Sequence, residues 1–173
     1  MGRLSRKPTS DDLARIYDAH AAAMFRHGMA LLRDEPSVHD LVQDVFLKLA
    51  DGRVALNSLQ SERAYLLRMV HHGAIDRMRR ESIRRDHREG AGQGELFAAI
   101  TDPDAAAFRN SLETAMAELP ADQREVVALK LGEGLTFQEI ADICGVSINT
   151  AASRYRYALD KLRGLLRPLY EEL

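Results

Sequence analysis

The stretch from Val70 to Arg80, VHHGAIDRMRR, holds two adjacent histidines, one aspartate and three arginines. Such side chains suit a metal site, a catalytic site or a surface for nucleic acid. Helical geometry argues against a metal pair, because consecutive residues point about 100° apart, whereas chelating histidines stand at i and i+4. The sequence also shows no nucleophile paired with a base and no phosphate-binding glycine loop. We therefore predict a protein that is not an enzyme and needs no metal or cofactor.

Charge is segregated along the chain. The formal net charge of the 173 residues is only −2. The segment from Arg63 to Arg88 nevertheless holds eight arginines against three acidic residues, and Ser147 to Arg167 holds five basic residues against one aspartate. Two basic segments in an otherwise acidic chain favour two contacts with a polyanion and a basic partner for the remainder. For either segment alone, a merely solvated helix face is the alternative.

Composition places the chain among soluble globular proteins. Hydrophobic residues make up 46% and charged residues 29%, and the one cysteine, Cys144, has no partner for an internal disulfide. No secretory signal opens the sequence, and its most apolar early stretch is too short to span a bilayer. We expect a cytoplasmic protein without membrane insertion, in which Cys144 serves as a buried hydrophobic residue.

Apolar periodicity and capping residues predict helices throughout. Three are expected in the first half: Ser10 as cap of a helix to about Arg33, Pro36 to about Ala50, and about Ser61 to about Arg85. The aperiodic, glycine-containing stretch DHREGAGQGELFAAITDPD predicts a flexible linker. Helices then resume at about Ala105. The predicted fold is all-α, with two small helical domains over 1–85 and 105–173 joined by a linker over 86–104.

The second predicted helix has two opposite faces. One carries the apolar residues expected of a core-facing stripe. The other places four residues at i, i+3, i+4 and i+7, which we call the acidic stripe: Asp40, Gln43, Asp44 and Leu47. A leucine among acidic side chains is unexpected on a solvated face, although such a face remains the alternative. The pattern favours docking of a basic partner helix, with Leu47 as the apolar contact.

The C-terminal half predicts a helix-turn-helix. Pro120 begins one helix, Thr136 caps a short second helix, Gly145 makes the turn, and Ser147 caps a long final helix to about Leu166. Ile148 is expected to face inward on that final helix. The outward face is expected to contact DNA through short polar side chains beside arginines. Its members are Asn149, Thr150, Ser153, Arg154, Arg156 and Tyr157.

Two blocks of this sequence resemble one protein family. VHDLVQDVFLKLA with ERAYLLRMVHHGAIDRMRR resembles the core-binding and start-proximal promoter region of bacterial RNA polymerase sigma factors of the extracytoplasmic-function type. LPADQREVVALKLGEGLTFQEIADICGVSINTAASRYRYALDKL resembles the upstream-promoter-binding domain of the same family. The resemblance implies core RNA polymerase, promoter DNA and an anti-sigma factor as partners. It also implies promoter-specific transcription initiation, with recognition of the minus-ten and minus-thirty-five elements and promotion of promoter melting.

The resemblance also assigns residue roles. The acidic stripe matches the family's contact with a basic coiled coil of polymerase, and the loop from Asp51 to Gln60 matches a pocket for a flipped base. The third helix matches the part that holds the minus-ten element as the duplex opens. Its DNA-binding residues are expected to be His71, His72, Asp76, Arg77, Arg79 and Arg80. Ile75 and Met78 are expected in the core.

Two departures from the family pattern leave alternatives open. His71 and His72 stand where many members have Arg-Asn, and Ala152 stands where a lysine is common. The first alternative is a sigma-like decoy that sequesters an anti-sigma protein without reading DNA. The second is a free-standing regulator that uses the same helix-turn-helix, which would leave the acidic stripe unexplained.

Overall fold

The computed structural model describes residues 7–52, 61–85 and 103–171, with side chains omitted at 83–85, 103–108 and 168–171. The chain divides into two compact units, an N-terminal unit over Met1–Gly92 and a C-terminal unit over Gln93–Leu173. Within the described residues there are helices and no strand, which confirms the all-α prediction. Most of the predicted linker, residues 86–102, and most of the predicted base pocket, residues 53–60, lie outside the described residues.

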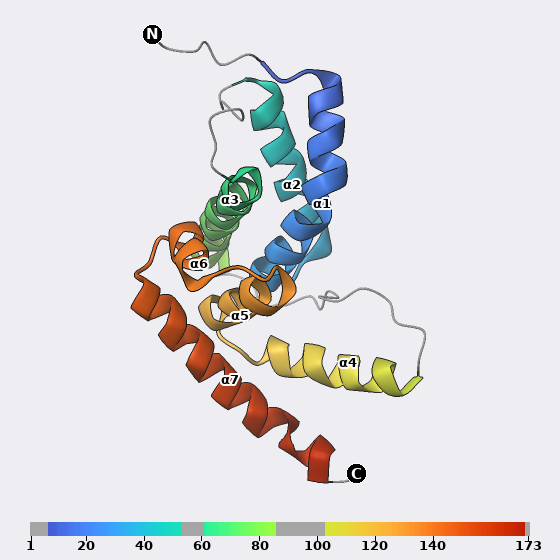
Figure 1. Cartoon of the computed structure of the whole chain (residues 1–173), viewed down its shortest axis with the longest axis vertical. Helices are drawn as coiled ribbons and strands as arrows, with labels where there is room; N and C mark the ends of the chain where they lie inside the picture. Colours follow the sequence, from blue (N-terminus) through green and yellow to red (C-terminus); the bar gives the residue numbers. More distant parts are fainter. Residues whose placement is uncertain (1–6, 53–60, 86–102, 172–173) are drawn as a thin grey trace. The chain divides into compact units, whose positions relative to one another are not determined.

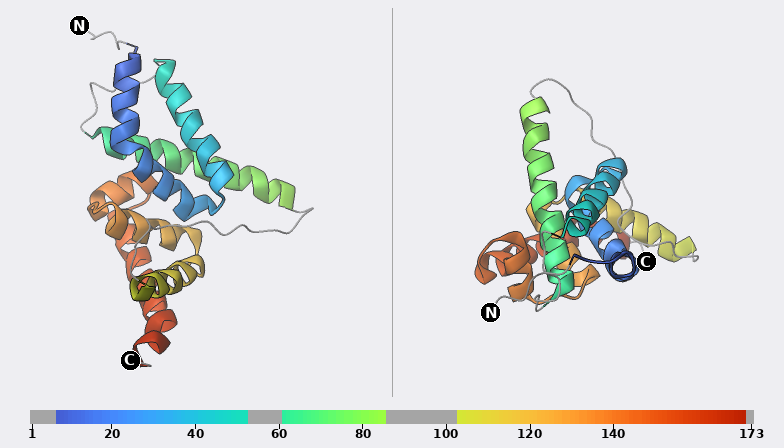
Figure 2. Two further views of the ribbon diagram at one scale, coloured as in Figure 1. Left: turned by 90° about the vertical axis from the view of Figure 1, so that its right-hand side faces the viewer. Right: turned by 90° about the horizontal axis from the view of Figure 1, so that it is seen from above.

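The N-terminal unit consists of three helices: α1 (Ser10–Leu32), α2 (Glu35–Ala50) and α3 (Glu62–Arg85). Each packs against the other two, and α3 crosses α1 and α2, which run beside each other (Figures 1 and 2). Their shared core is aliphatic, because each helix turns one apolar stripe inward. The fully buried residues include Ile16, Met24, Val38, Val45, Leu49, Leu66, Leu67 and Val70.

Capping residues set the helix starts in this unit, with small shifts from the prediction. Thr9, and not Ser10, caps α1 and forms a capping box with Asp12. Asp34 caps α2 by accepting from the Ser37 amide at 3.0 Å, so α2 begins at Glu35. Only Arg33 and Asp34 separate α1 from α2, and Arg33 takes the left-handed conformation (φ 55°) to reverse the chain.

Two glycines let α2 approach its neighbours closely. A Cβ on Gly28 of α1 would lie 2.8 Å from Val38 Cγ1, and one on Gly73 of α3 would lie 2.4 Å from Leu41 Cδ1. Val38 and Leu41 are both buried, so neither can swing into solvent to make room. Gly73, which stands beside the two histidines in the sequence, thus has a packing role against α2.

The C-terminal unit contains α4 (Pro103–Ala117), α5 (Ala121–Val127), a π-helical turn η2 (Ala128–Gly132), α6 (Phe137–Cys144) and α7 (Ile148–Glu171). Helices α4, α5 and α6 all pack on α7 (Figure 1). Pro120 occupies the N-cap position of α5, one residue before the helix begins, and makes no side-chain capping bond. Helix α4 begins two residues before the expected Ala105. The final helix extends five residues past the expected Leu166.

The helix-turn-helix is formed by α6 and α7. Thr136 caps α6 in a capping box with Glu139, and Gly145 ends it with φ 66°. Ser147 Oγ accepts from the Thr150 amide at 3.0 Å and so caps α7 as predicted. Helix α6 packs against α7, and its residues Ile140, Ala141 and Cys144 are buried. The buried role predicted for Cys144 is confirmed, and burial raises the pKa of its thiol well above its ordinary range.

Two predictions of burial are wrong. Ile148 is 46% exposed and Ile75 is 41% exposed. Ile148 lies in the first turn of α7, and burial on that helix begins only at Ala151. Ile75 lies about 100° around α3 from Ala74, which is the last fully buried residue before the arginines. Ile148 therefore lies before the part of α7 that the rest of its unit covers, and Ile75 lies on a side of α3 that is left uncovered.

Candidate nucleic-acid and partner interfaces

The acidic stripe forms an exposed face of α2. Asp40, Gln43, Asp44 and Leu47 are all exposed, and Leu47 is 58% exposed. They lie on the side of α2 opposite its buried residues, so their exposure follows from the amphipathic pattern. On one flank, Phe46 contacts the ring of Tyr17 from α1 at a centroid distance of 5.4 Å. Acidic groups around an exposed leucine fit a basic partner that also offers an apolar contact.

The other flank of the stripe is joined to α3 by Arg77. Arg77 Nη2 lies 2.5 Å from Asp44 Oδ2, and Nη1 donates to the carbonyl oxygen of Ser37 at 3.2 Å. The Arg77 side chain is 26% exposed and that of Asp44 is 53% exposed. One predicted DNA contact and one predicted partner contact are therefore held together in the free chain.

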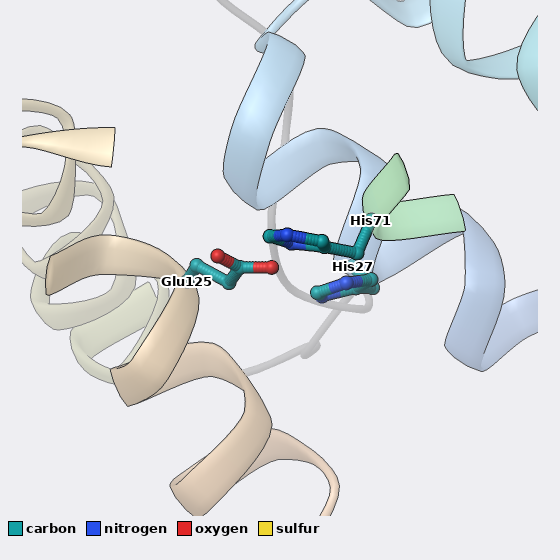
Figure 3. Close-up of side chains that lie close together, drawn as sticks. All are labelled: His27, His71 and Glu125. Atoms are coloured by element: carbon teal, nitrogen blue, oxygen red, sulfur yellow. The ribbon is translucent and has the colours of Figure 1, made fainter. Parts of the chain in front are cut away.

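The two histidines of α3 face different surroundings. His72 is exposed, whereas His71 is half-buried against α1. The His71 ring lies nearly parallel to the ring of His27 from α1, with centroids 6.5 Å apart and planes at 24° (Figure 3). His72 meets His71 only edge-on, at 5.6 Å between centroids. Of the pair, His72 is the one that α3 presents to solvent.

The remaining predicted DNA-binding residues of α3 are accessible. Asp76, Arg79 and Arg80 are exposed, and Ile75 beside them is exposed as well. Exposed arginines on one helix attract phosphate, and an exposed apolar side chain next to them can contact an unstacked base. Ile75 is thus an additional candidate that sequence reasoning missed, because it was expected in the core.

A second cluster anchors the start of α3. Arg15 forms a bidentate ion pair with Glu62, with Nη1–Oε1 at 3.1 Å and Nη2–Oε2 at 2.8 Å. His20 Nε2 lies 2.8 Å from the same Oε1. The hydrogen bond from Arg15, with that of His20, holds the pKa of the Glu62 carboxyl below its ordinary value against the opposing effect of burial. This cluster fixes the end of α3 that follows the predicted base pocket.

The outward face of α7, which was predicted to contact DNA, is mostly open. Asn149, Thr150, Arg156 and Tyr157 are exposed, while Ser153 and Arg154 are half-buried. Thr150 also shares a 2.8 Å hydroxyl contact with the capping Ser147. Arg154 Nε lies 3.0 Å from Asp122 Oδ2 of α5, and the Arg156 guanidinium lies over the Tyr157 ring at 5.4 Å. The arginine with the freer approach to a ligand is therefore Arg156.

Comparisons with known proteins agree with this architecture. The model of sigma-70 region 2 matches residues 16–83, and that of sigma-70 region 4 matches residues 109–162. The extracytoplasmic-function (ECF) RNA polymerase sigma factor SigC of Mycobacterium tuberculosis is 32% identical over 136 residues, which cover 78% of this chain and 72% of that protein. SigL of the same species, also an ECF sigma factor, is 29% identical over 158 residues, covering 89% and 88%.

A solved structure shares the fold. The sigma factor RpoE from Bartonella quintana, crystallised in complex with the anti-sigma factor NepR, superposes with a TM-score of 0.76 at 24% identity, covering 91% of this chain and 98% of that one. The chain therefore belongs to the ECF family of RNA polymerase sigma factors, whose role is in transcription initiation. Among the described helices, none is both long and apolar enough to cross a membrane.

Proposed function

We propose that this protein binds core RNA polymerase through the acidic stripe of α2 and directs it to specific promoters. In this proposal α3 holds the minus-ten element as it melts, and α7 reads the minus-thirty-five element. The observation that supports this proposal most directly is the pair of exposed surfaces on one chain. One unit has the acidic stripe with Leu47, and the other has the outward face of the helix-turn-helix. These are the two surfaces that a bridge between a basic protein and DNA requires.

The energetics favour such a bridge. Opening duplex DNA costs stacking free energy of about 1.4 kcal/mol per base-pair step, which arginines and stacking on a captured strand can offset in part. Each DNA contact is expected to be weak alone, because each offers few cations. Attachment of both units to polymerase makes the second DNA contact intramolecular and raises its effective concentration.

We assign residues 1–85 to the polymerase and minus-ten functions and residues 105–173 to the minus-thirty-five function, with 86–104 as the linker. This division is supported by the two compact units, Met1–Gly92 and Gln93–Leu173, and by separate family matches over residues 16–83 and 109–162. The DNA-contacting residues proposed on α3 are His71, His72, Asp76, Arg77, Arg79 and Arg80. Those proposed on α7 are Asn149, Thr150, Ser153, Arg154, Arg156 and Tyr157.

Co-elution with core polymerase and run-off transcription test the proposal. Asp44→Arg would also break the contact with Arg77, so Asp40→Arg is the cleaner change to the stripe. The matched control is Asp18→Arg, the same charge reversal at an exposed position of α1 that faces away from the core. We expect the wild type and Asp18→Arg to co-elute with core and Asp40→Arg to bind it more weakly. Failure of the wild type to co-elute would refute the proposal.

An anti-sigma factor is proposed as a further partner, supported by the complex in which the RpoE relative was crystallised. The decoy alternative gains some support from α7, where Arg154 is engaged by Asp122 and Ala152 offers no cation. The two roles differ in transcription. A decoy gives no promoter-specific transcript from a genomic fragment library with core polymerase, whereas a sigma factor does.

A further inference from the structure

We propose that the Arg77–Asp44 ion pair couples the two faces of the N-terminal unit, so that a basic partner bound at Asp44 releases Arg77 for nucleic acid. This inference rests on the proposed function, because it needs a basic partner on α2 and DNA along α3. Arg77 is then a positioning residue in the free chain. Its pairing with Asp44 weakens both interfaces until one of them is occupied.

The geometry of the pair supports an exchangeable contact. Arg77 reaches back from α3 to α2 with both terminal nitrogens, one on the Asp44 carboxylate and one on the Ser37 carbonyl oxygen. Asp44 keeps 53% of its side chain exposed, so an incoming cation can approach it without unfolding the helix. Arg77 keeps 26% exposed, so its guanidinium is held but accessible from solvent.

The neighbours of the pair provide internal comparisons. Asp40 lies one helical turn before Asp44 on the same stripe and is exposed. Arg80 lies three residues after Arg77 on α3 and is exposed as well. Arg77 contacts Asp44, and its second bond goes to a backbone carbonyl. Neutralising Asp40 therefore changes the charge of its face by as much as neutralising Asp44, and Arg80 is matched to Arg77 in the same way. Neither of these two changes touches the Arg77–Asp44 pair.

Competition for Asp44 produces cooperativity between the two ligands. A partner cation that takes Oδ2 of Asp44 displaces Arg77, and the displaced guanidinium regains its full attraction for a phosphate. An ion pair of this exposure shifts an equilibrium by about two- to fivefold. Coupling between two binding equilibria is reciprocal, so DNA that binds Arg77 also favours the partner at Asp44 by the same factor.

The first test measures the affinity of the full chain for core polymerase. Arg77→Gln frees Asp44 and is expected to tighten core binding by about two- to fivefold. The matched control Arg68→Gln, at an exposed arginine of α3 outside the proposed sites, should leave core binding unchanged. A thermal melt by circular dichroism checks that both variants are folded. Unchanged or weaker binding by folded Arg77→Gln overturns the inference.

The second test measures binding of the free full chain to a fluorescent dT20 oligonucleotide at low salt. Asp44→Asn is expected to tighten binding by about two- to fivefold, and by more than Asp40→Asn, which removes the same charge. Freeing one cation also steepens the dependence of log K on log salt by about 0.7. In the Arg77→Gln background the difference between the two aspartate variants should disappear.

These outcomes separate the inference from the proposed function. If wild-type protein fails to bind core polymerase, both are wrong, since the stripe then has no such partner. If wild type binds core but Asp44→Asn and Asp40→Asn bind the oligonucleotide equally, only the coupling is wrong. This second comparison keeps Arg77 in place, so it decides the matter even if Arg77→Gln proves unfolded.

Discussion

The two units use their charged residues in different ways. In the N-terminal unit, contacts between charged side chains join the helices: Arg15 and His20 to Glu62, and Arg77 to Asp44. In the C-terminal unit, three cations satisfy backbone carbonyls. Arg124 donates to Leu119 O at 2.9 Å, Lys161 to Glu118 O at 2.5 Å and Lys130 to Leu135 O at 2.9 Å.

This difference has a physical consequence. A carboxylate can be protonated in acid or can form an ion pair with another cation. A backbone carbonyl keeps its partial charge at every pH. The N-terminal unit is thus expected to respond to pH and to charged ligands, and the C-terminal unit to hold its shape. Arg154 with Asp122 is an exception in the C-terminal unit, and it lies on the proposed DNA-reading face.

The largest effect is expected when a carbonyl-capping cation is removed. Arg124 is 5% exposed and donates to the carbonyls of Ala117 and Leu119 where α4 ends. Arg124→Met leaves these acceptors without their donor and should cost about 2–3 kcal/mol of the stability of the C-terminal unit. Hydrogen exchange by mass spectrometry reports the two units separately. Exposed Arg156→Met is the control, and equal loss in both variants would contradict the capping role.

Promoter affinity should respond differently to the two arginines of α7. Arg156→Ala removes an exposed cation and is expected to weaken binding of holoenzyme to its promoter by about 1–2 kcal/mol. Arg154→Ala should cost less, because Arg154 must first leave Asp122 to meet DNA. Asp122→Asn releases Arg154. In that background, Arg154→Ala should weaken promoter binding by more than it does in the wild type. Fluorescence anisotropy on promoter DNA measures all three variants, and a larger loss for Arg154 than for Arg156 would reverse this ranking.

Gly28 in the N-terminal unit and Gly164 in the C-terminal unit differ in the space around them. Gly28 lies against Val38, a stiff β-branched side chain in the core, whereas a Cβ on Gly164 of α7 would meet nothing within 4 Å. Gly28→Ala should cost about 1–2 kcal/mol, because overpacking outweighs the gain in helix propensity. Gly164→Ala should instead stabilise by about 0.5–1 kcal/mol. Urea denaturation followed by circular dichroism measures both, and stabilisation by Gly28→Ala would show that α1 and α2 can move apart at little cost.

Local signals in the sequence were sufficient for much of the fold. Thr136, Gly145 and Ser147 act within a few residues of themselves, so their capping and turn roles could be predicted. The apolar stripe of α2 is likewise a local pattern, and burial of Val38, Leu41, Val45 and Leu49 confirms it. The acidic stripe is exposed as expected, and its binding role stays a prediction.

Features that depend on tertiary geometry could not be predicted. Glu62 is 47 residues from Arg15 and Arg77 is 33 residues from Asp44, and no sequence period connects such pairs. Exposure of Ile75 and Ile148 depends on where neighbouring helices stop covering them, which is equally non-local. Arg77 and Arg154 could be predicted as cations near DNA, but their acidic partners appear only once the helices are packed.

The smallest effect, and the one most specific to the N-terminal unit, concerns acid. The folded-state pKa of Glu62 lies below its ordinary value, so its contacts contribute stability above that ordinary value and lose it as pH falls through the lowered pKa. With solvent screening, the contribution should be about 0.5–1 kcal/mol.

Glu62→Gln should therefore lower the stability of the N-terminal unit at pH 7 and converge with wild type as pH falls through the lowered pKa of Glu62, because the wild-type carboxyl is then protonated as well. Hydrogen exchange of α1 and α3 at pH 7, with circular dichroism melts from pH 7 to 3, measures this convergence. Asp18→Asn, which removes one negative charge at an exposed position of α1, is the control and should lower the stability at pH 7 by less than Glu62→Gln does. A constant gap between Glu62→Gln and wild type at all pH values would mean that the carboxylate charge is not what anchors α3, and that the shape of the side chain alone does so.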